Sequence, residues 1–139
     1  MTARKVPDKA MRHRVLIIDD EESMRLVLAR ILVNDLHAEV TLAGTCEQAL
    51  RLAEAAPYDG ILLDLRMPGI GGMAVLQQVR RSGPNTKTPI IVVSAVVEKD
   101  AIERCLAAGA TAYITKPVNS AELAKALKKH LPGSSHARN

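Results

Sequence analysis

The stretch Ile61-Leu62-Leu63-Asp64-Leu65-Arg66-Met67-Pro68-Gly69 decides the fold of this 139-residue chain. It begins with a short aliphatic run, which is typical of a strand that is covered on both faces. The run ends in an acid, Asp64, and a Pro-Gly turn signal follows it. An unpaired ionised carboxylate near a hydrophobic core costs free energy. Asp64 therefore indicates a functional position at the end of a buried strand.

Similar apolar runs occur four more times along the chain. They are Val15-Leu16-Ile17-Ile18, Ala38-Glu39-Val40-Thr41-Leu42, Pro89-Ile90-Ile91-Val92-Val93 and Ala112-Tyr113-Ile114. Most are nearly continuous in apolar character, as expected for buried strands of a parallel sheet. The run at 38–42 alternates between apolar and polar residues, which favours an edge strand.

Helical patterns fill the gaps between these runs. Apolar residues recur at spacings of three and four in segments 24–32, 49–53, 73–79, 101–106 and 123–131. Their ends carry the usual signals: a capping box at 45–48, Gly71-Gly72, Gly109 as a C-terminal glycine, Asn119 or Ser120 as a start, and Pro132-Gly133 as a stop. Five strand–helix units predict an α/β fold with a parallel sheet, helices on both faces and right-handed crossovers.

The composition fits one domain with an aliphatic core. Hydrophobic residues make up 47% of the chain, which has two tyrosines and neither Phe nor Trp. This argues against aromatic stacking platforms for single-stranded nucleic acid. Residues 1–14 hold five basic and one acidic side chain, and residues 125–139 hold four basic and no acidic ones, so the body between them is acidic. We expect the basic ends to be solvated tails, with no direct nucleic-acid binding.

The two cysteines, Cys46 and Cys105, lie in predicted helices without metal-ligand spacing. We expect both to be reduced thiols of a cytoplasmic protein. The basic start runs into residues 15–18 and then into two acids, so we see no signal peptide. The apolar runs are too short to span a membrane, and we expect no membrane association.

Reactive side chains follow four of the five predicted strands. They are Asp19 and Asp20 after the first strand, Asp64 after the third, Ser94 after the fourth and Lys116 after the fifth. In an open α/β sheet, ligands bind beyond the carboxyl ends of the strands. Three carboxylates that close repel one another, and Mg²⁺ with a phosphate oxygen would remove that conflict. The set therefore predicts a magnesium-dependent phosphoryl-transfer site in which a carboxylate is the covalent acceptor.

Each of these residues also has a purely structural interpretation. Asp19 and Asp20 could favour the start of the following helix, where acids meet the positive end of the helix dipole. Ser94 could cap the next turn, and Lys116 could lie along the surface with its ammonium in water. Tyr113 could be an ordinary half-buried strand residue. Only the combination at one edge of one sheet favours the functional reading.

The sequence resembles the receiver domains of two-component response regulators, including the single-domain chemotaxis regulators. The matching motifs are Ile17-Ile18-Asp19-Asp20-Glu21, Leu62-Leu63-Asp64-Leu65-Arg66-Met67-Pro68-Gly69, Val92-Val93-Ser94-Ala95 and Tyr113-Ile114-Thr115-Lys116-Pro117. The match covers residues 13–131, which leaves a basic N-terminal extension, 1–12, and a short polar tail, 132–139. The resemblance implies a flavodoxin-like (βα)5 fold with strand order 2-1-3-4-5. Since little follows the last helix, we expect a free-standing regulator.

The resemblance also implies a role for each matching residue. Asp64 would be the phospho-acceptor, and Ser94 and Lys116 would bind the phosphoryl group. Mg²⁺ would be held by Asp20, by Asp19 directly or through water, by Asp64, and by the backbone carbonyl of Arg66. Tyr113 would be the switch aromatic, turning inward when Ser94 is drawn to the phosphate. The bond between Lys116 and Pro117 would be cis.

Two positions near the expected site vary within such proteins. Arg66 and Val96 should border its mouth, and we hypothesise that Arg66 changes the lifetime of the phosphorylated state. The phosphoryl group would come from a histidine kinase or a phosphotransfer protein. The face formed by the fourth helix, the fifth strand and the fifth helix would then switch and bind an unknown output protein. The chain would be a monomer or a phosphorylation-dependent dimer.

Three other functions remain open at this point. A haloacid-dehalogenase-like phosphohydrolase would also use an acid, a hydroxyl, a lysine and Mg²⁺, but its nucleophile follows the first strand and a second acid stands where Arg66 is. A pure interaction module would not need the intact set of acids. A nucleic-acid binder is suggested only by the basic ends. We therefore expect no enzyme beyond catalysis of the chain's own phosphorylation and dephosphorylation.

Overall fold

The computed structural model describes residues 12–132. The strands are β1 (Arg14–Ile18), β2 (Glu39–Ala43), β3 (Gly60–Leu63), β4 (Ile90–Ser94) and β5 (Ala112–Thr115). The helices are α1 (Glu22–Leu36), α2 (Cys46–Ala55), α3 (Gly72–Arg81), α4 (Lys99–Ala107) and α5 (Ser120–His130). The predicted alternation of five strands and five helices is confirmed. The predicted N-terminal extension and polar tail lie outside the described residues, except for Arg12 and Pro132.

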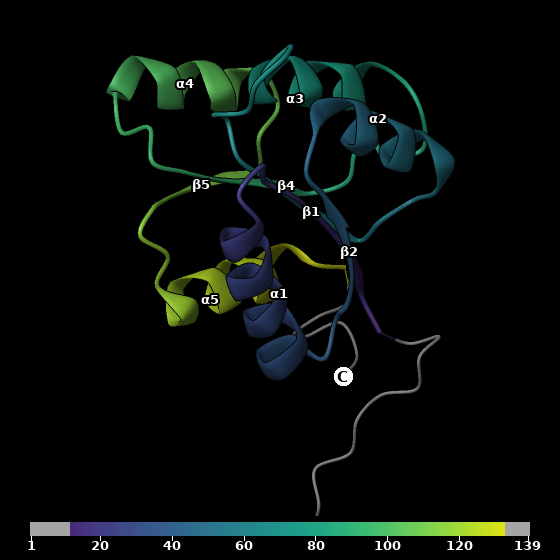
Figure 1. The fold of residues 1–139 in the computed structure, drawn as a ribbon, viewed down its shortest axis with the longest axis vertical. Coiled ribbons are helices and arrows are strands. Elements are labelled where there is room, and N and C mark those ends of the chain that lie inside the picture. The colour runs from purple at the N-terminus through teal and green to yellow at the C-terminus, as the bar shows by residue number, and fades with distance from the viewer. Residues whose placement is uncertain (1–11, 133–139) are drawn as a thin grey trace, which may run out of the picture.

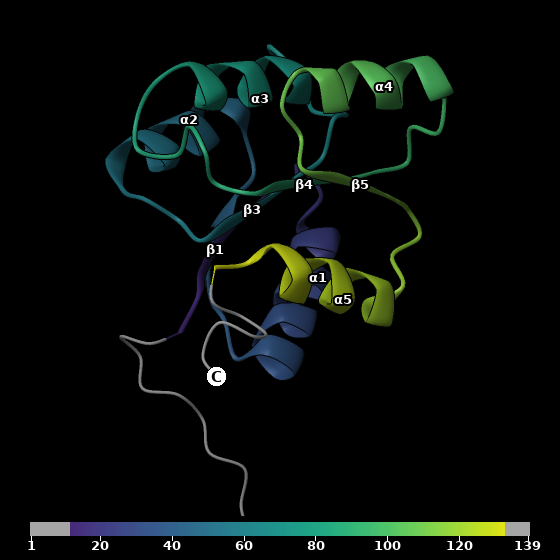
Figure 2. The ribbon, with the colours of Figure 1, turned by 180° about the vertical axis from the view of Figure 1, so that it is seen from behind.

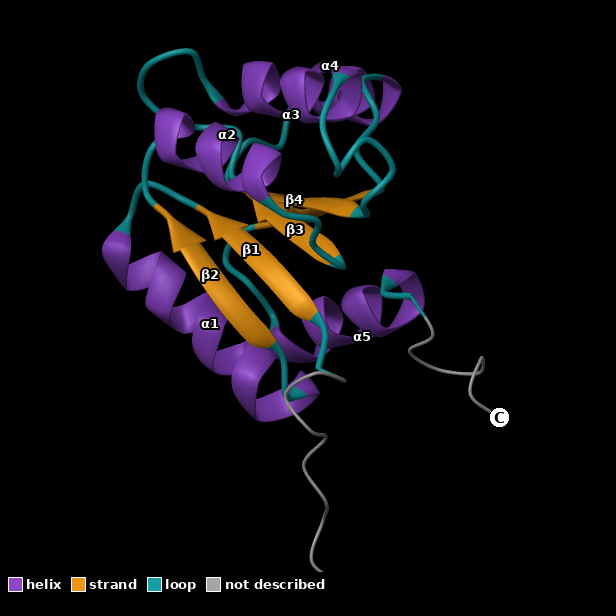
Figure 3. Ribbon diagram, turned by 90° about the vertical axis from the view of Figure 1, so that its right-hand side faces the viewer, coloured by secondary structure: helices purple, strands orange, loops and turns teal. Residues whose placement is uncertain are grey.

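The five strands form one parallel sheet in the order β2-β1-β3-β4-β5. Figure 3 shows β2, β1, β3 and β4 side by side. This order confirms the predicted flavodoxin-like fold and the edge position of β2. At the carboxyl end of the sheet, Ile18 pairs with Ala43 on one side and with Leu63 on the other. The residues that follow β1, β2 and β3 therefore leave the sheet at the same level.

Helices cover both faces of the sheet (Figures 1 and 2). Helices α2, α3 and α4 lie on one face, and α1 and α5 lie on the other. Alternate residues of β1 point into different cores because side chains alternate along a strand. Leu16 and Ile18 belong to the core under α2 and α3, whereas Val15 and Ile17 belong to the core under α1 and α5. The sheet is thus buried on both sides, as its aliphatic runs predict.

Two helix starts form as the sequence predicts. The Thr45 hydroxyl accepts a hydrogen bond from the Gln48 backbone N–H at 3.0 Å, and the Asn119 side chain accepts one from Glu122 N–H at 2.9 Å. The second half of the predicted capping box differs. The Gln48 side-chain oxygen accepts from the N–H of Gly44, at 2.9 Å, rather than from that of Thr45. Gln48 therefore also holds the end of β2.

Helix α1 is longer than its apolar pattern predicts. It begins at Glu22 and continues to Leu36, past Asn34 and Asp35. Helical hydrogen bonding continues there although these side chains add nothing to an apolar stripe. The helix ends at His37, which adopts the left-handed conformation with φ of 52°. The His37 N–H donates to the Val33 carbonyl and the Ala38 N–H to the Leu32 carbonyl, each at 3.1 Å.

Both cysteines are free thiols buried in the core under α2 and α3, which agrees with the predicted helix-borne thiols. Within residues 12–132, no helix is both long enough and apolar enough to cross a membrane.

Candidate functional site

Three acids gather where β1 and β3 end. One carboxylate oxygen from each of Asp19, Asp20 and Asp64 lies within 4.8 Å of the others. Asp19 and Asp64 are only 1% and 5% exposed, whereas Asp20 is exposed. The sequence therefore predicts this cluster correctly, because parallel strands bring their carboxyl ends to one edge of the sheet.

Hydrogen bonds with main-chain groups hold two of these acids in place. The Asp64 N–H donates to the Ile18 carbonyl at 3.0 Å, which continues the ladder between β1 and β3. Each side chain then closes a short turn of its own: Asp19 Oδ1 accepts from the N–H of Glu21 at 2.9 Å, and Asp64 Oδ1 accepts from that of Arg66 at 3.0 Å. Asp19 and Asp64 are thus held in place by main-chain donors.

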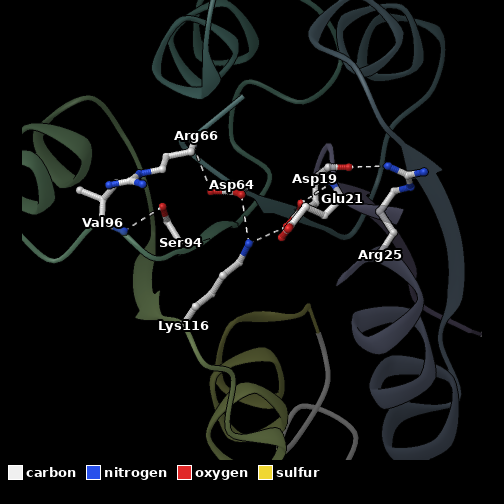
Figure 4. Close-up of polar contacts among 8 residues, drawn as sticks. All are labelled: Asp19, Glu21, Arg25, Asp64, Arg66, Ser94, Val96 and Lys116. Atoms are coloured by element: carbon white, nitrogen blue, oxygen red, sulfur yellow. Dashed lines mark hydrogen bonds and ion pairs between the residues drawn. The ribbon is translucent and has the colours of Figure 1, made fainter. Parts of the chain in front are cut away.

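Lys116 joins the two buried acids (Figure 4). Its Nζ lies 2.9 Å from Asp19 Oδ2 and 3.0 Å from Asp64 Oδ2, and its side chain is only 12% exposed. Burial alone lowers the pKa of Lys116, but the two carboxylates outweigh it, so its pKa is raised above 10.5. The surface interpretation of Lys116 is wrong. The bond to Pro117 is cis, as expected.

Ser94 and Tyr113 meet the same piece of backbone after β4. Ser94 is fully buried, and its hydroxyl oxygen accepts from the Val96 N–H at 3.3 Å. The Tyr113 hydroxyl donates to the Val96 carbonyl at 2.6 Å. Tyr113 is half-buried, and this burial raises the pKa of its phenol. Both predicted switch residues therefore contact Val96, and both do so through its main chain.

A cleft of about 300 Å³ opens over the acids. Its lining residues are Asp20, Glu21, Asp64, Arg66, Ala95 and Lys116. Asp64 is the carboxylate that is both largely buried and open to this cleft. The exposed Arg66 lies at its border.

The donor set fits a divalent cation. Three carboxylates and one ammonium leave two negative charges at one point, and two of the three acids are buried. Such a concentration of charge is unfavourable without a counter-ion. Mg²⁺ prefers oxygen ligands and binds through one or two carboxylates while keeping several waters. The cluster supplies the carboxylate oxygens, and the cleft beside it leaves space for the waters.

Sequence reasoning missed two contacts at this site. Glu21 lines the cleft and supplies its N–H to Asp19. Arg25 donates from Nη1 to the backbone carbonyl of Asp19 at 2.7 Å. Both contacts use main-chain atoms, which leave no trace in the choice of residue types. Only the position of Arg25 on α1, six residues after Asp19, was available as a signal.

Comparisons with known proteins give the family. The model of the response regulator receiver domain matches residues 15–128. The chemotaxis protein CheY4 of Vibrio cholerae superposes with a TM-score of 0.80 at 31% identity, covering 86% of this chain and 99% of that one. The receiver domain of a sensor histidine kinase of Pseudomonas aeruginosa PAO1 superposes with a TM-score of 0.78 at 32% identity, covering 86% and 97%. That structure has a magnesium ion coordinated in its active site cleft.

Curated relatives are longer proteins. The sensory/regulatory protein RpfC of Xanthomonas campestris is 39% identical over 79% of this chain and 15% of its own length. The response regulator GacA of Pseudomonas aeruginosa is 34% identical over 86% of this chain and 56% of its own length. The chain thus spans less than two thirds of either relative. With the fold, the acid cluster and the family match in agreement, the chain belongs to the response regulator receiver domain family of two-component systems.

Proposed function

We propose that this chain is a phosphorylation-dependent regulator in which Asp64 accepts a phosphoryl group from the phosphohistidine of a histidine kinase or phosphotransfer protein. The observation that carries the proposal is the position of Asp64: it is buried beside two other acids, paired with Lys116, and open to a cleft. An acid held only for stability has no reason to border a cleft among like charges.

The acceptor step requires one bond to form and one to break. A carboxylate oxygen of Asp64 attacks phosphorus while the P–N bond to the donor histidine breaks. Lys116 Nζ already lies 3.0 Å from Asp64 Oδ2, and its ammonium then pairs with the negative charge of the phosphoryl group. Mg²⁺, held by Asp19, Asp20, Asp64 and the backbone carbonyl of Arg66, would neutralise charge on the phosphoryl oxygens. The Ser94 hydroxyl donates to one of these oxygens.

Phosphorylation is read out through the loop after β4. Ser94 and Tyr113 both bond to Val96, so a serine that turns toward the phosphoryl group releases Val96 N–H and loosens the carbonyl that holds Tyr113. Tyr113 then turns inward, and the face of α4, β5 and α5 changes its preference for an output protein. In this proposal the receiver extends over residues 13–131 and acts as a monomer or a phosphorylation-dependent dimer in the cytoplasm.

Arg66 and Val96 would tune the lifetime of the phosphorylated form. Arg66 is exposed at the border of the cleft, two residues after Asp64, where its guanidinium can limit the approach of water. Loss of the phosphoryl group should therefore be faster in Arg66→Ala than in the wild type. An unchanged dephosphorylation rate would contradict this role. The chain catalyses only its own phosphorylation and dephosphorylation in this account.

The acceptor is tested with a labelled small phosphodonor, with and without Mg²⁺. The wild type should take up about one equivalent of label in Mg²⁺, and Asp64→Asn should take up none. Asp35→Asn is a matched control, since Asp35 is exposed on α1 and outside the cluster. Label on Asp64→Asn, or turnover of many equivalents of a phosphate ester, would overturn the proposal. Beryllofluoride should change the Tyr113 spectrum in the wild type and in Asp35→Asn but not in Asp64→Asn.

A further inference from the structure

We propose that Arg25 is a positioning residue of the metal site, which fixes the peptide between Asp19 and Asp20 and so aims the Asp20 carboxylate at the cation. The inference rests on the metal site of the proposed function. Arg25 itself touches no reacting atom, because within residues 12–132 the one hydrogen bond of its side chain goes to a main-chain oxygen.

The contact of Arg25 is short and local. Its Nη1 donates to the Asp19 carbonyl at 2.7 Å from the first turn of α1 (Figure 4). That turn is anchored to the same loop, because the Arg25 N–H donates to the carbonyl of Glu21 at 3.0 Å. Arg25 is half-buried. The loop from β1 to α1 is thus bonded twice to one residue.

Gly44 leaves the space that the guanidinium occupies. A β carbon at Gly44 would lie 2.7 Å from Arg25 Nη1 and 3.2 Å from Cζ, so the guanidinium, at the end of a flexible side chain, would have to shift. Gly44 follows β2, next to the end of β1. Its lack of a side chain therefore explains how Arg25 reaches the Asp19 carbonyl, and it offers a way to displace Arg25 without removing its charge.

Asp20 needs such support more than the other two acids do. Asp19 and Asp64 each pair with Lys116 and with a main-chain N–H. Asp20 is exposed, and its side chain makes no hydrogen bond or ion pair with any described residue. Its direction therefore depends on the main chain. The Asp19 carbonyl belongs to the peptide that leads into Asp20, so a bond to that oxygen restricts the backbone rotation that would turn Asp20 away.

The inference predicts that removal of Arg25 weakens Mg²⁺ binding, whereas its charge alone predicts tighter binding. A cation beside an acid cluster repels Mg²⁺, so simple removal of the Arg25 charge should tighten Mg²⁺ binding. Loss of a residue that orients a metal ligand weakens binding, typically by 10- to 100-fold. If Arg25 positions Asp20, removal of Arg25 must weaken Mg²⁺ binding even though it also removes the repulsion between Arg25 and the cation.

The test is a Mg²⁺ titration of the full chain by calorimetry. Arg25→Met and Gly44→Ala should each raise the Kd for Mg²⁺, by about tenfold for Arg25→Met. Arg25→Lys, which keeps a cationic donor, should bind more tightly than Arg25→Met. Arg30→Met is the matched control: Arg30 is exposed on the same helix, and its loss should leave the Kd unchanged or slightly lower.

The outcomes separate this inference from the proposed function. Urea unfolding in EDTA should give similar free energies for Gly44→Ala and the wild type, so that a weaker Kd cannot be assigned to poor folding. Equal or tighter Mg²⁺ binding by Arg25→Met would overturn the role of Arg25 and leave the proposed function intact. A wild-type chain that binds no Mg²⁺ would overturn both.

Discussion

Lys116 is the residue on which the buried charge of the site depends. Two carboxylates that are almost fully buried face one ammonium, at 2.9 and 3.0 Å. Ionised groups are expensive to bury unless they are paired and hydrogen-bonded, and removal of one partner leaves the other uncompensated. In the absence of metal, Lys116 is the one cation of the described residues in direct contact with these acids.

Lys116→Met should therefore separate stability from metal affinity. The metal-free variant should lose about 2–3 kcal/mol of unfolding free energy, because Asp19 and Asp64 repel each other without the ammonium. Mg²⁺ should bind this variant more tightly than the wild type, since no lysine competes for the carboxylates. Urea unfolding with EDTA and with Mg²⁺ measures both effects. A smaller gain from Mg²⁺ in the variant than in the wild type would contradict the competition.

Tyr113 should give the free energy of unfolding a dependence on alkaline pH. Burial raises the pKa of its phenol above the ordinary 10.0, so the unfolded chain loses this proton at a lower pH than the folded chain. The contribution to stability is complete below about pH 10 and is lost as the pH rises through the folded pKa. Lys116, whose pKa is also raised, adds a loss of the same sign above about pH 10.5.

The expected result is a fall in unfolding free energy above about pH 10 that is shallower in Tyr113→Phe than in the wild type. Urea unfolding at several pH values measures it, and the absorbance of the phenolate reports the titration itself. Parallel pH profiles for the two proteins would show that Tyr113 does not contribute.

At the scale of elements, Asn85 joins the segments that lead into β3 and β4. It is 1% exposed, and its side-chain oxygen accepts from the Tyr58 N–H and from the Thr88 hydroxyl, each at 2.8 Å. Its amide nitrogen donates to the carbonyls of Ala53, at 2.7 Å, and Ala56, at 2.9 Å, at the end of α2. One side chain thus satisfies four partners from three segments.

Asn85→Ala should lower the unfolding free energy by about 2–4 kcal/mol, because it leaves several buried polar groups without partners. Asn34→Ala, at an exposed position on α1, should stay within about 0.5 kcal/mol of the wild type. Chemical denaturation of the two variants makes the comparison. Equal stabilities would mean that water replaces the Asn85 side chain without cost.

The elements themselves could be read from the sequence because each has a local cause. Aliphatic runs predict buried strands, and Thr45 and Asn119 cap helices with their own side chains. Asn85 and Arg25 could not be found in this way. Both bond to main-chain carbonyls, and an asparagine or arginine in that role looks the same in sequence as one in water.

The candidate site shows the same division. Its acids could be predicted together because parallel strands deliver their ends to one edge, and the order of strands follows from the family resemblance. The pairing of Lys116 with Asp19 and Asp64 could not be predicted, since it depends on the path of the chain after β5. Ser94 and Tyr113 both form hydrogen bonds to the Val96 main chain, and this arrangement likewise depends on tertiary structure.

At the scale of the whole molecule, two hydrophobic cores share one sheet. Leu123 on α5 is fully buried in one core, and Cys105 on α4 is fully buried in the other. Strands β1, β3 and β4 each contribute side chains to both cores. Loss of either helical layer would expose its own face of the sheet to water, and the same strands also carry the other core, so we expect the two layers to unfold together.

This coupling can be tested from one core to the other. In a Cys46→Ala background, Cys105 is the only thiol, and burial both covers it and raises its pKa, so its reaction with a thiol reagent should require opening of the fold. Leu123→Ala should lower the unfolding free energy by about 2–5 kcal/mol. Because each 1.4 kcal/mol is a factor of ten, Cys105 should then react roughly thirtyfold faster or more.

Leu26→Ala provides the control, since Leu26 is 55% exposed on α1 and its truncation leaves no cavity. Its Cys105 rate should match that of the Cys46→Ala background. If Leu123→Ala lowered the stability measured by circular dichroism while the Cys105 rate stayed the same, α4 would open independently of the opposite layer. The α4, β5 and α5 face would then move as separate parts, and a signal from Asp64 could reach α4 without disturbing α5.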